Sequence, residues 1–517
     1  MSSPTATGPH RGAITILVML ATIMQALDTT IANVALPYMQ SSLSASQDQI
    51  NLVLTSYIVA AAIVMPPTGW LSARLGRKRL FIISVIGFTV ASLLCGAAQS
   101  LLQMVLFRLL QGIFGATLVP LSQAVLLDAY PRERHGSAMA LWGVGVMVGP
   151  ILGPTLGGWL TENYDWRWVF YINLPVGILT ALGLWAYLDR NEPQRGLGFD
   201  WAGFLALSLG IGCLQMLLDR GEQLQWFAAP EIMIETALSA LGFYLFFVLT
   251  FLGERPFLDL RLFRDRNFST GMVFIFIVGV ILLASLALLT PFLQTLLDYP
   301  VMTAGELLAP RGIGTMVAMI LVGRLVNRVD PRWLVAAGFG LTALSLWQMS
   351  GFSLDVTASM IVTSGVTQGL GLGFIFVPLS TMTFATLPAE LRTAGTALYS
   401  LSRNLGSSID ISVFIYLLGR YSRGAHAMLA ESIQPFRDVV QQLPAPLDPT
   451  QASGRALLDA VVSRQSALLG FLSDFRLMMF VALAAIPFVV LMRRPVHDPH
   501  PRGADDEMGA ELAVGVE

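Results

Sequence analysis

The sequence predicts an all-α membrane protein of fourteen transmembrane helices, in which two similar six-helix bundles flank two inserted helices. Of its 517 residues, 55% are hydrophobic and only 12% are charged, and the mean hydropathy is +0.67. Soluble domains contain about 25% charged residues, and a soluble chain of this length would need more polar side chains to cover its surface. The number of helices follows from the apolar runs, and their grouping follows from an internal repeat.

Fourteen apolar runs approach the roughly 20 residues that a membrane-spanning helix needs. The predicted spans lie near 14–36, 51–72, 80–98, 103–127, 137–160, 167–187, 200–219, 231–252, 269–291, 302–326, 332–352, 358–386, 393–418 and 472–492. Arginine and lysine occur in the segments at 73–79, 131–135, 189–195, 261–266, 327–332 and 493–495. The alternate loops at 41–50, 98–102, 292–301 and 353–357 contain neither residue. Because positively charged loops stay in the cytoplasm, both termini are expected there.

An internal repeat groups these helices. The stretch GWLSARLGRKR at 69–79 is similar to GRLVNRVDPRW at 323–333, and VPLS occurs at both 119–122 and 377–380. Repeats of this kind are common in transporters whose substrate site lies between two halves. We expect four parts: a six-helix bundle at 1–190, two inserted helices with linkers at 191–266, a second six-helix bundle at 267–494 with a periplasmic loop at 419–470, and a disordered tail at 495–517.

The long outer loop is expected to contain one amphipathic helix. Apolar residues between 457 and 468 recur there at helical spacing. It is the one long segment expected on the outer side, so it is a candidate surface for a periplasmic partner.

Two charges lie inside apolar runs of the first half. The stretch LDTTIANVALP at 27–37 contains Asp28, and Arg108 lies within the fourth run. At about 1.5 Å per residue, both fall at a similar depth on the outer side of the membrane midplane. A lone ionised group there costs about 2.5–3.5 kcal/mol on insertion scales, so such groups usually pair or face a cavity. We expect Asp28 to belong to a proton or substrate site, with Arg108 at a similar depth. The alternative is that Asp28 is an N-cap or a structural hydrogen-bonding group at a helix break.

The loop motif GWLSARLGRK at 69–78 predicts part of a conformational gate. Gly69 and Gly76 bracket a tight loop between the second and third spans, where Arg74 and Arg77 face the cytoplasm. Alternatively, the arginines only anchor the loop at the cytoplasmic surface. The recurrence of the motif in the second half favours the gate.

The fifth span carries the stretch GVGVMVGPILGPTLGG at 143–158. Its glycines recur every four residues and include Gly149 and Gly153, with Pro150 and Pro154 among them. Small residues allow a neighbouring helix to approach closely, and prolines bend a helix. We assign these four residues to the gate, and an ordinary packing seam is the alternative.

The thirteenth span carries Arg403 and Asp410, which we also expect to take part in proton coupling. They are seven residues apart, hence near one helix face and about 10 Å apart along the axis. Burial of ionised Asp410 would be costly, which favours a second protonatable site over an ionised group in the outer water layer. The substrate cavity is expected to be lined by Gln25, Tyr57, Gln111, Gln294, Arg311 and Tyr399.

Several chemistries have no motif in the sequence. It lacks a GxxxxGK[ST] phosphate-binding loop, and its only lysine is Lys78, so ATP is not expected to power it directly. The HExxH and GxSxG motifs and Cys/His metal-ligand spacings are also absent. We expect a protein that is no enzyme, needs no cofactor or metal and binds no nucleic acid.

Three motifs resemble the signatures of the major facilitator superfamily: GWLSARLGRK, FRLLQGIFGA at 107–116, and the glycine series at 143–158. The stretch LDTTIANVALP and the glycine series are similar to those of fourteen-helix drug:proton antiporters. The segments MLLDRGEQLQWF (216–227), LDLRLFRDRNF (258–268) and ESIQPF (431–436) resemble segments of EmrB-type multidrug exporters. The resemblance covers nearly the whole chain.

This resemblance implies the major facilitator fold and proton-driven efflux of lipophilic drugs and toxic compounds by alternating access. It places the protein in the bacterial inner membrane, working with a periplasmic membrane-fusion adaptor and an outer-membrane channel. By the same resemblance, Asp28 matches the family's acid on the first helix, and Arg108 matches the arginine linked to proton transfer.

The chain departs from the family pattern at two positions. Ala73 stands where the loop motif usually has an acid, which argues against a charge-based latch at this loop. Asp410 stands where EmrB-type chains usually have glycine. Two other functions remain open: a dedicated exporter of one endogenous molecule, such as a fatty acid, siderophore or secondary metabolite, and a non-transporting receptor or scaffold. The repeated loop motif and the buried charges disfavour the receptor or scaffold.

Overall fold

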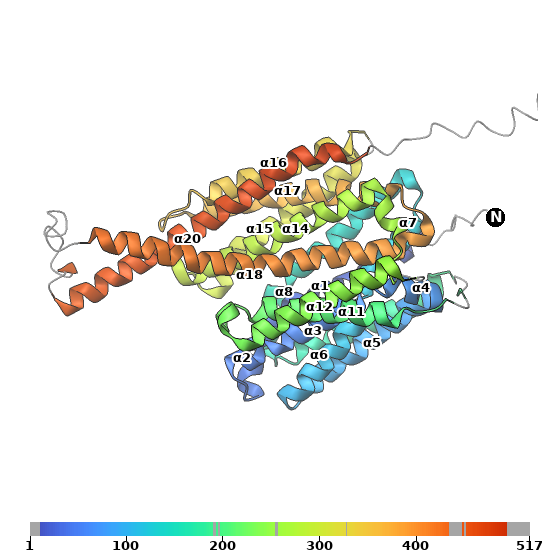
Figure 1. Ribbon diagram of the computed structural model, residues 1–517, viewed down its shortest axis with the longest axis horizontal. Coiled ribbons are helices and arrows are strands. Elements are labelled where there is room, and N and C mark those ends of the chain that lie inside the picture. The colour runs from blue at the N-terminus through green and yellow to red at the C-terminus, as the bar shows by residue number, and fades with distance from the viewer. Residues whose placement is uncertain are drawn as a thin grey trace, which may run out of the picture.

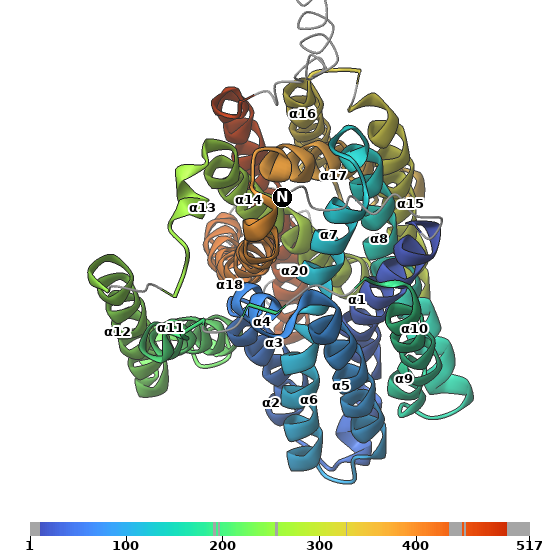
Figure 2. The same ribbon diagram turned by 90° about the vertical axis from the view of Figure 1, so that its right-hand side faces the viewer.

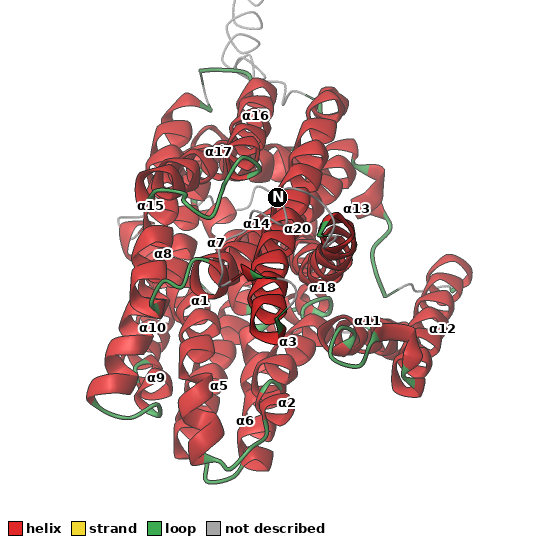
Figure 3. Ribbon diagram, turned by 90° about the vertical axis from the view of Figure 1, so that its left-hand side faces the viewer, coloured by secondary structure: helices red, strands yellow, loops and turns green. Residues whose placement is uncertain are grey.

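The computed structural model describes residues 11–189, 193–194, 197–253, 257–326, 328–433, 447–448 and 451–493. Within these residues every regular element is a helix, and most helices run along one common direction (Figure 1, Figure 3). The all-α prediction is therefore confirmed for the described part of the chain.

The first six predicted spans form one group of helices, and three of these spans are interrupted. Pro66 and Pro67 separate the second span into two helices that meet at a bend of 62°, because proline lacks the N–H group that continues a helix. The elements are α1 (Arg11–Ser42), α2 (Gln47–Ile50), α3 (Leu52–Val64), α4 (Thr68–Leu75), α5 (Arg77–Ala97), α6 (Leu101–Gly115), α7 (Leu118–Ala129), α8 (His135–Asn163), α9 (Trp168–Tyr171) and α10 (Asn173–Tyr187).

The two inserted helices, α11 (Trp201–Arg220) and α12 (Pro230–Leu252), lie beside the bundles. Asp200 is the N-cap of α11, and its side chain accepts a hydrogen bond from the backbone N–H of Gly203. This bond satisfies one of the free N–H groups at the start of the helix. Figure 2 shows α12 at the edge of the molecule, and α11 packs between α12 and α3. Because α11 contacts α3 of the first group and also packs against the helix at 392–432, it lies at the boundary between the two bundles.

The last six predicted spans form a second group. The helices of this second group approach one another closely at small residues. For example, a Cβ added at Gly373 of α17 would lie only 2.5 Å from the Cβ of Ala318 on α15. The elements are α13 (Arg261–Arg264), α14 (Arg266–Pro291), a short π-helix η3 (Phe292–Leu296), α15 (Val301–Leu325), α16 (Pro331–Met349), α17 (Ala358–Ala385), α18 (Arg392–Ser432) and α20 (Ala452–Phe488).

All fourteen predicted spans coincide with helices or broken helices, but fewer meet the criteria of a membrane span. Among the described residues, eleven helices are long and apolar enough to cross a membrane, or twelve if the bent pair α3–α4 is one span. The helices α16 and α18 are not among them. In α18 the reason is its polar stretch SLSRNLGSSIDIS at 400–412. The count of fourteen spans therefore stays a prediction.

The expected outer loop at 419–470 is largely helical. The helix α18 is 41 residues long and α20 is 37, about twice what a span needs, so both extend beyond the bundles as a helical hairpin (Figure 1, left). The helix expected near 457–468 is confirmed as the first part of α20, in which Leu458 and Val462 are buried whereas Leu457 and Val461 are exposed. Residues 434–446 and 449–450 of the loop, and the tail expected at 495–517, lie outside the described residues.

Candidate functional site

The carboxylate of Asp28 and the guanidinium of Arg108 form a buried ion pair. Arg108 Nη1 lies 2.7 Å from Asp28 Oδ2, and the two side chains are only 1% and 0% exposed. Gln111 closes a triangle with them: its Nε2 donates to Asp28 Oδ1 at 2.7 Å, and its Oε1 accepts from Arg108 Nη1 at 2.8 Å. Arg108 and Gln111 can act together because residues three apart share one face of α6.

Further donors complete this network. Asn173 at the start of α10 donates from Nδ2 to Asp28 Oδ1 at 3.2 Å and to Ser92 Oγ at 3.0 Å. Arg108 Nε donates to the backbone oxygen of Val53 at 3.1 Å. Val53 lies in the first turn of α3, close to the break between α2 and α3. The sequence reasoning missed Asn173 and Ser92. Each is a polar residue within an apolar run, which is the signal that could have found them.

The ring of Tyr57 supports the arginine from a third side. The Arg108 Cζ lies 4.5 Å from the centre of this ring, within the range of a cation–π interaction. Every charge in the network therefore has partners, and the pair is neutral as a whole. A proton bound at Asp28 would cancel the carboxylate charge and leave Arg108 without its counterion. The arrangement can thus convert proton binding into a large electrostatic change.

Beside this network lies a cavity of about 520 Å³ between the two bundles, a size typical of small-molecule sites. Its lining includes Gln25 and Tyr57, as predicted for the cavity, and Gln25 Nε2 donates to the Tyr57 hydroxyl at 3.2 Å. Arg108 also reaches the cavity wall.

The other four residues predicted for the cavity lie away from its lining. Gln111 is in the ion-pair network, and Gln294 lies in η3 at the end of α14. Arg311 of α15 and Tyr399 of α18 are buried in the second bundle. Their assignment to a substrate cavity stays a prediction.

Arg403 lines the cavity from α18 and is the cation of this site that lacks a protein counterion. In the described part of the chain its side chain makes no ion pair and no hydrogen bond. Asp410 does not face this cavity, so the structure does not bring the two residues together. Their joint role in proton coupling stays a prediction, and the cavity contains a positive charge that a ligand can approach.

The inserted helix α11 joins the two bundles beside the cavity. Asp219 on α11 accepts a hydrogen bond from Thr55 of α3, and both Asp219 and Gln215 line the cavity. Gln215 Nε2 donates to Ser408 Oγ of α18 at 2.9 Å, and Ser412 Oγ donates to the Leu218 oxygen at 2.5 Å. One helix therefore contacts both halves through polar groups.

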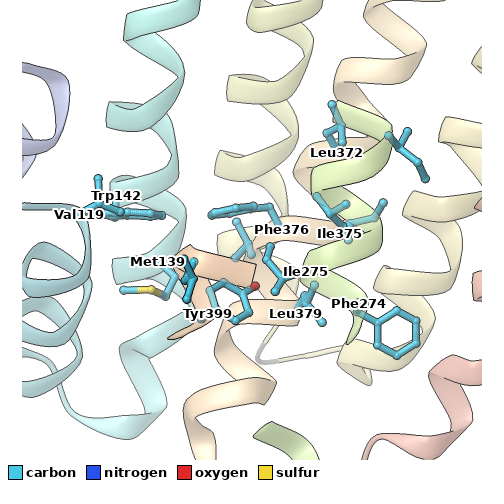
Figure 4. Packing of buried hydrophobic residues seen from close by; sticks show 14 of the residues in the cluster. Val119, Met139, Trp142, Phe274, Ile275, Leu372, Ile375, Phe376, Leu379 and Tyr399 are labelled. Carbon is cyan, nitrogen blue, oxygen red and sulfur yellow. The ribbon is translucent and has the colours of Figure 1, made fainter. Parts of the chain in front are cut away.

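An apolar layer closes the cavity toward the end of the molecule at which the arginine-rich loops lie, which we call the basic end. Trp142 of α8 stacks on Phe376 of α17, with ring centres 5.8 Å apart and planes 13° apart. Figure 4 shows these two rings facing each other across the bundle boundary, with Val119 beside Trp142 and Tyr399 below Phe376 in this view. Because Val119 and Phe376 also line the cavity, this layer separates it from the basic end.

Beyond this layer, an ionic latch joins the bundles. Asp128 at the end of α7 accepts from Arg77, and its Oδ1 lies 2.6 Å from Nη1 of Arg392, the first residue of α18. Arg77 Nη2 also donates to Thr393 Oγ1 at 3.1 Å. The expectation from Ala73 that no charge-based latch forms here was wrong, because Asp128 from outside the loop supplies the acid that binds both Arg77 of the loop and Arg392.

The other residues of the loop motif have different surroundings. A side chain at Gly69 would lie 2.6 Å from the Cβ of Ala394, so α4 and α18 touch here across the boundary. Gly76 has a φ of 84°, a conformation that favours glycine. Arg74 is exposed to solvent. Gly69 and Arg77 thus contact the second bundle, and Arg74 does not.

The glycine series on α8 forms a close seam with α1. A Cβ at Gly149 would lie 2.6 Å from the backbone of Ala26, and Thr30 Oγ1 donates to the Gly149 oxygen at 3.0 Å. Gly153 is buried against the same part of α1, and Pro150 lines the cavity, whereas Pro154 is exposed. The packing seam is therefore present, and a conformational role for these residues stays a prediction.

Comparisons with known proteins agree with this architecture. The family model described as "Major Facilitator Superfamily" matches residues 18–409. The chain is 36% identical over 502 residues to the "Fatty acid resistance protein FarB" of Neisseria gonorrhoeae, covering 96% of this chain and 99% of that protein. It is 37% identical over 440 residues to the "Multidrug export protein EmrB" of Escherichia coli (strain K12), covering 84% and 85% of the two chains.

Two solved structures share the fold at 13% sequence identity. One is the human organic anion transporter MFSD10, with a TM-score of 0.61 over 93% of this chain and 100% of that chain. The other is the proton:xylose symporter XylE, with a TM-score of 0.60 over 93% of this chain and 95% of that chain.

Proposed function

Because the chain belongs to the major facilitator superfamily, a family of transporters rather than enzymes, we propose that it drives efflux of lipophilic compounds by exchange for protons. The multidrug exporters among its relatives support this class of substrate. The observation that carries the proposal is the neutral Asp28–Arg108 pair buried beside a cavity between two bundles. A carboxylate with this surrounding can hold one proton at a time next to the substrate.

The coupling step follows from the electrostatics of the network. A proton that enters from the outer side binds Asp28 and removes its attraction to Arg108. The uncompensated guanidinium then favours a rearrangement of α1 against α6, which alters the cavity that both helices line. Each charge moved across the membrane supplies about 2.3 kcal/mol per 100 mV. This energy is sufficient to bias two conformations that differ by a few kcal/mol.

In alternating access the two bundles, 1–190 and 267–494, move relative to each other, with α11 and α12 from 191–266 beside them. In this proposal the basic end faces the cytoplasm, and both termini lie there. The stacked Trp142 and Phe376 and the latch at Asp128 hold this end closed. Inward opening requires that these contacts break, and Gly69 and Gly149 lie at the seams where helices slide.

The helical hairpin of α18 and α20 supports a role in a tripartite system of the inner membrane. It extends from the end opposite the basic loops, which faces the periplasm in this orientation. Exposed apolar side chains lie on it, among them Met428, Leu457 and Val461. Such a surface is suited to a periplasmic membrane-fusion adaptor, which would connect the pump to an outer-membrane channel.

A transport assay with purified protein tests the proposed exchange. The protein is reconstituted into liposomes with an imposed pH gradient, and accumulation of a lipophilic fluorescent dye is recorded with and without an uncoupler. We expect accumulation that disappears when the gradient is collapsed. Accumulation that persists without any proton gradient would contradict proton-driven export. In cells, a deletion strain should become more sensitive to several unrelated lipophilic compounds.

A second candidate is the export of one endogenous anionic amphiphile, such as a fatty acid. The cavity lining is largely apolar, and Arg403 places a positive charge in it without a protein counterion. A long-chain carboxylate matches both features, because a carboxylate can bind a guanidinium through two hydrogen bonds. The relative named as a fatty acid resistance protein supports the same candidate. A deletion strain sensitive to long-chain fatty acids alone would favour it over multidrug export.

A further inference from the structure

We infer that Asp219 is a cation-binding residue, which gives the cavity between the bundles a site for positively charged amphiphiles at its outer end. This site deepens the proposed export of lipophilic compounds, and its role in transport rests on that function. Asp219 lies in the last turn of the inserted helix α11 and lines the cavity. The sequence reasoning included it only within the segment at 216–227 and gave it no role.

Three charged side chains line the cavity, and two of them have a charge that no protein group neutralises. The three are Arg108, Asp219 and Arg403. The charge of Arg108 is neutralised by Asp28 at 2.7 Å. Neither Asp219 nor Arg403 forms an ion pair in the described part of the chain. The cavity therefore offers a ligand one free negative charge and one free positive charge.

Arg220, the next residue of α11, binds two other acids. Its Nη2 lies 2.7 Å from Glu231 Oε2, and its Nη1 lies 3.4 Å from Glu235 Oε1, both on α12. The outer end of the two inserted helices thus contains three carboxylates around one guanidinium. A cation that binds Asp219 would therefore enter a region of excess negative charge and would displace no ion pair of the protein.

The carboxylate of Asp219 is held in place by a neutral partner. It accepts a hydrogen bond from the hydroxyl group of Thr55 on α3, which orients the carboxylate without neutralising it. One turn earlier on α11, Gln215 Nε2 donates to Ser408 Oγ of α18 at 2.9 Å. The helix is therefore fixed to both bundles beside the cavity. Because Asp219 is also exposed, a cation can reach it from solvent.

Asp219 and Arg403 lie at different levels of the cavity. Two hydrogen bonds join α11 to α18, and their partners are 193 and 194 residues apart in sequence. The two helices therefore run in the same direction, and the level of Asp219 corresponds to about position 412 on α18. At about 1.5 Å per residue, this level is roughly 13 Å farther from the basic end than Arg403. The two free charges are thus separated along the cavity.

An organic cation with an apolar chain fits the surroundings of Asp219. A charge in a poorly hydrated cavity needs a counterion, and this carboxylate supplies one to a positively charged head group. The rest of the lining is largely apolar and includes Ala61, Met65 and Leu372, which suits the chain. Groups of three or more metal-ligating side chains are absent from the described residues, whereas Ca²⁺ takes six to eight oxygen ligands. An anionic amphiphile would bind the same cavity with its head group at Arg403 instead.

Equilibrium binding of ligands that share a dodecyl chain tests this site. Dodecyltrimethylammonium and dodecanol each displace the neutral fluorescent dye N-phenyl-1-naphthylamine from the purified protein in nanodiscs of zwitterionic lipid. Asp219→Asn is expected to weaken the binding of dodecyltrimethylammonium about fivefold, the size of one partly exposed ionic contact, and to leave dodecanol binding unchanged. Arg403→Gln should not weaken the binding of the ammonium ligand. Unchanged ammonium affinity in Asp219→Asn, or an equal loss for dodecanol, would overturn the inference.

Control variants separate the charge of Asp219 from its contact with α3. Thr55→Val removes the hydrogen bond but keeps the carboxylate, so ammonium affinity should be retained. The same loss in Thr55→Val as in Asp219→Asn would show that Asp219 only connects two helices. Asp355→Asn, which removes an exposed acid outside the cavity lining, should have no effect. Thermal unfolding checks that each variant is folded.

The binding assay also distinguishes this site from the proposed export. It uses no proton gradient, so its result does not depend on how transport is driven. Failure of dye accumulation in liposomes would contradict proton-driven export and leave the binding result unchanged. Loss of the charge-selective effect of Asp219→Asn would contradict the cation site and leave export unchanged.

Discussion

Arg392 of the second bundle binds the carboxylate of Asp128 in the first bundle, with 2.6 Å between Nη1 and Oδ1. Arg77 binds the other oxygen of the same carboxylate. The two arginines come from segments more than 300 residues apart in sequence, and both form ion pairs with Asp128. Removal of this single side chain therefore cuts the ionic connection between the bundles at the basic end.

Asp128→Asn is expected to shift the protein toward the conformation that is open at this end. Partly exposed ion pairs contribute up to about 1 kcal/mol each, and a loss of one to two kcal/mol shifts an equilibrium by roughly 5- to 30-fold. The measurement is the labelling rate of a cysteine placed at Ala394, which packs against Gly69 in the closed state. Arg74→Gln, which removes an exposed arginine from the same loop, should leave the rate unchanged. Equal labelling of wild type and Asp128→Asn would show that the latch does not hold this end closed.

Gly149→Ala is expected to impair both folding stability and export. The new Cβ would meet the backbone of Ala26 at 2.6 Å, and overpacking of this kind costs about 1–3 kcal/mol. Gly158→Ala on the same helix is the matched control, because nothing lies within 4 Å of a Cβ there. Thermal unfolding of the two purified variants gives the comparison. If both substitutions have the same effect, the close approach of α8 to α1 has no special role.

The depth of Asp28 and Arg108 could be predicted from their positions along two apolar runs, and the structure joins them at 2.7 Å. The contact between Gln111 and Arg108 could also have been predicted, because the two residues are three apart and therefore lie on one face of the same helix. Asn173 was not, because its contact with Asp28 depends on how α10 is rotated against α1. Helix rotation is set by packing over the whole bundle, and one sequence does not specify it.

Asp474, a buried acid on α20, could have been identified from the sequence, whereas the pairing of Asp128 with Arg392 could not. Asp474 lies in the apolar run FLSDFRL, so the rule that identified Asp28 and Asp410 applied to it as well. The pairing of Asp128 with Arg392 could not be read from the chain, because the residues lie in different halves. The loop motif contributes Arg77 to the latch, whereas Asp128 and Arg392 come from two helix ends outside that motif.

Arg403→Gln is expected to weaken the binding of anionic amphiphiles selectively. A hydrogen bond to a charged group contributes about 1.5–3 kcal/mol, so dodecanoate affinity should fall by about tenfold to a hundredfold. Dodecanol, which has the same chain but no charge, should bind as it does to the wild type, and Arg403→Lys should retain most of the dodecanoate affinity. Binding is measured by displacement of a fluorescent dye. Equal losses for dodecanoate and dodecanol would exclude Arg403 as an anion site.

The helical hairpin is expected to contact a periplasmic adaptor. Cysteines placed at Met428, Leu457 and Val461, which are exposed apolar positions on the hairpin, should crosslink to it in cells. A cysteine at Leu102, an exposed apolar position at the start of α6, is the control. The absence of any adaptor crosslink from all three hairpin positions would exclude this surface.

Asp28→Asn is expected to lower stability as well as abolish coupling. Loss of one partner of a buried ion pair costs about 3–5 kcal/mol, because the other charge stays behind uncompensated. The double variant Asp28→Asn, Arg108→Gln removes both charges, so its thermal unfolding temperature should recover toward that of the wild type. A double variant that is less stable than either single variant would indicate that the two residues are not energetically paired.

Substrate-driven proton movement in liposomes tests the central role of Asp28 most directly. A lipophilic dye gradient is imposed across liposomes that contain a trapped pH indicator, and the internal pH is followed for the wild type, Asp28→Asn and the stability-restored double variant. The wild type should move protons against the dye flux. Both variants should bind the dye, remain folded and move no protons. Wild-type proton movement in the Asp28→Asn protein would contradict the account.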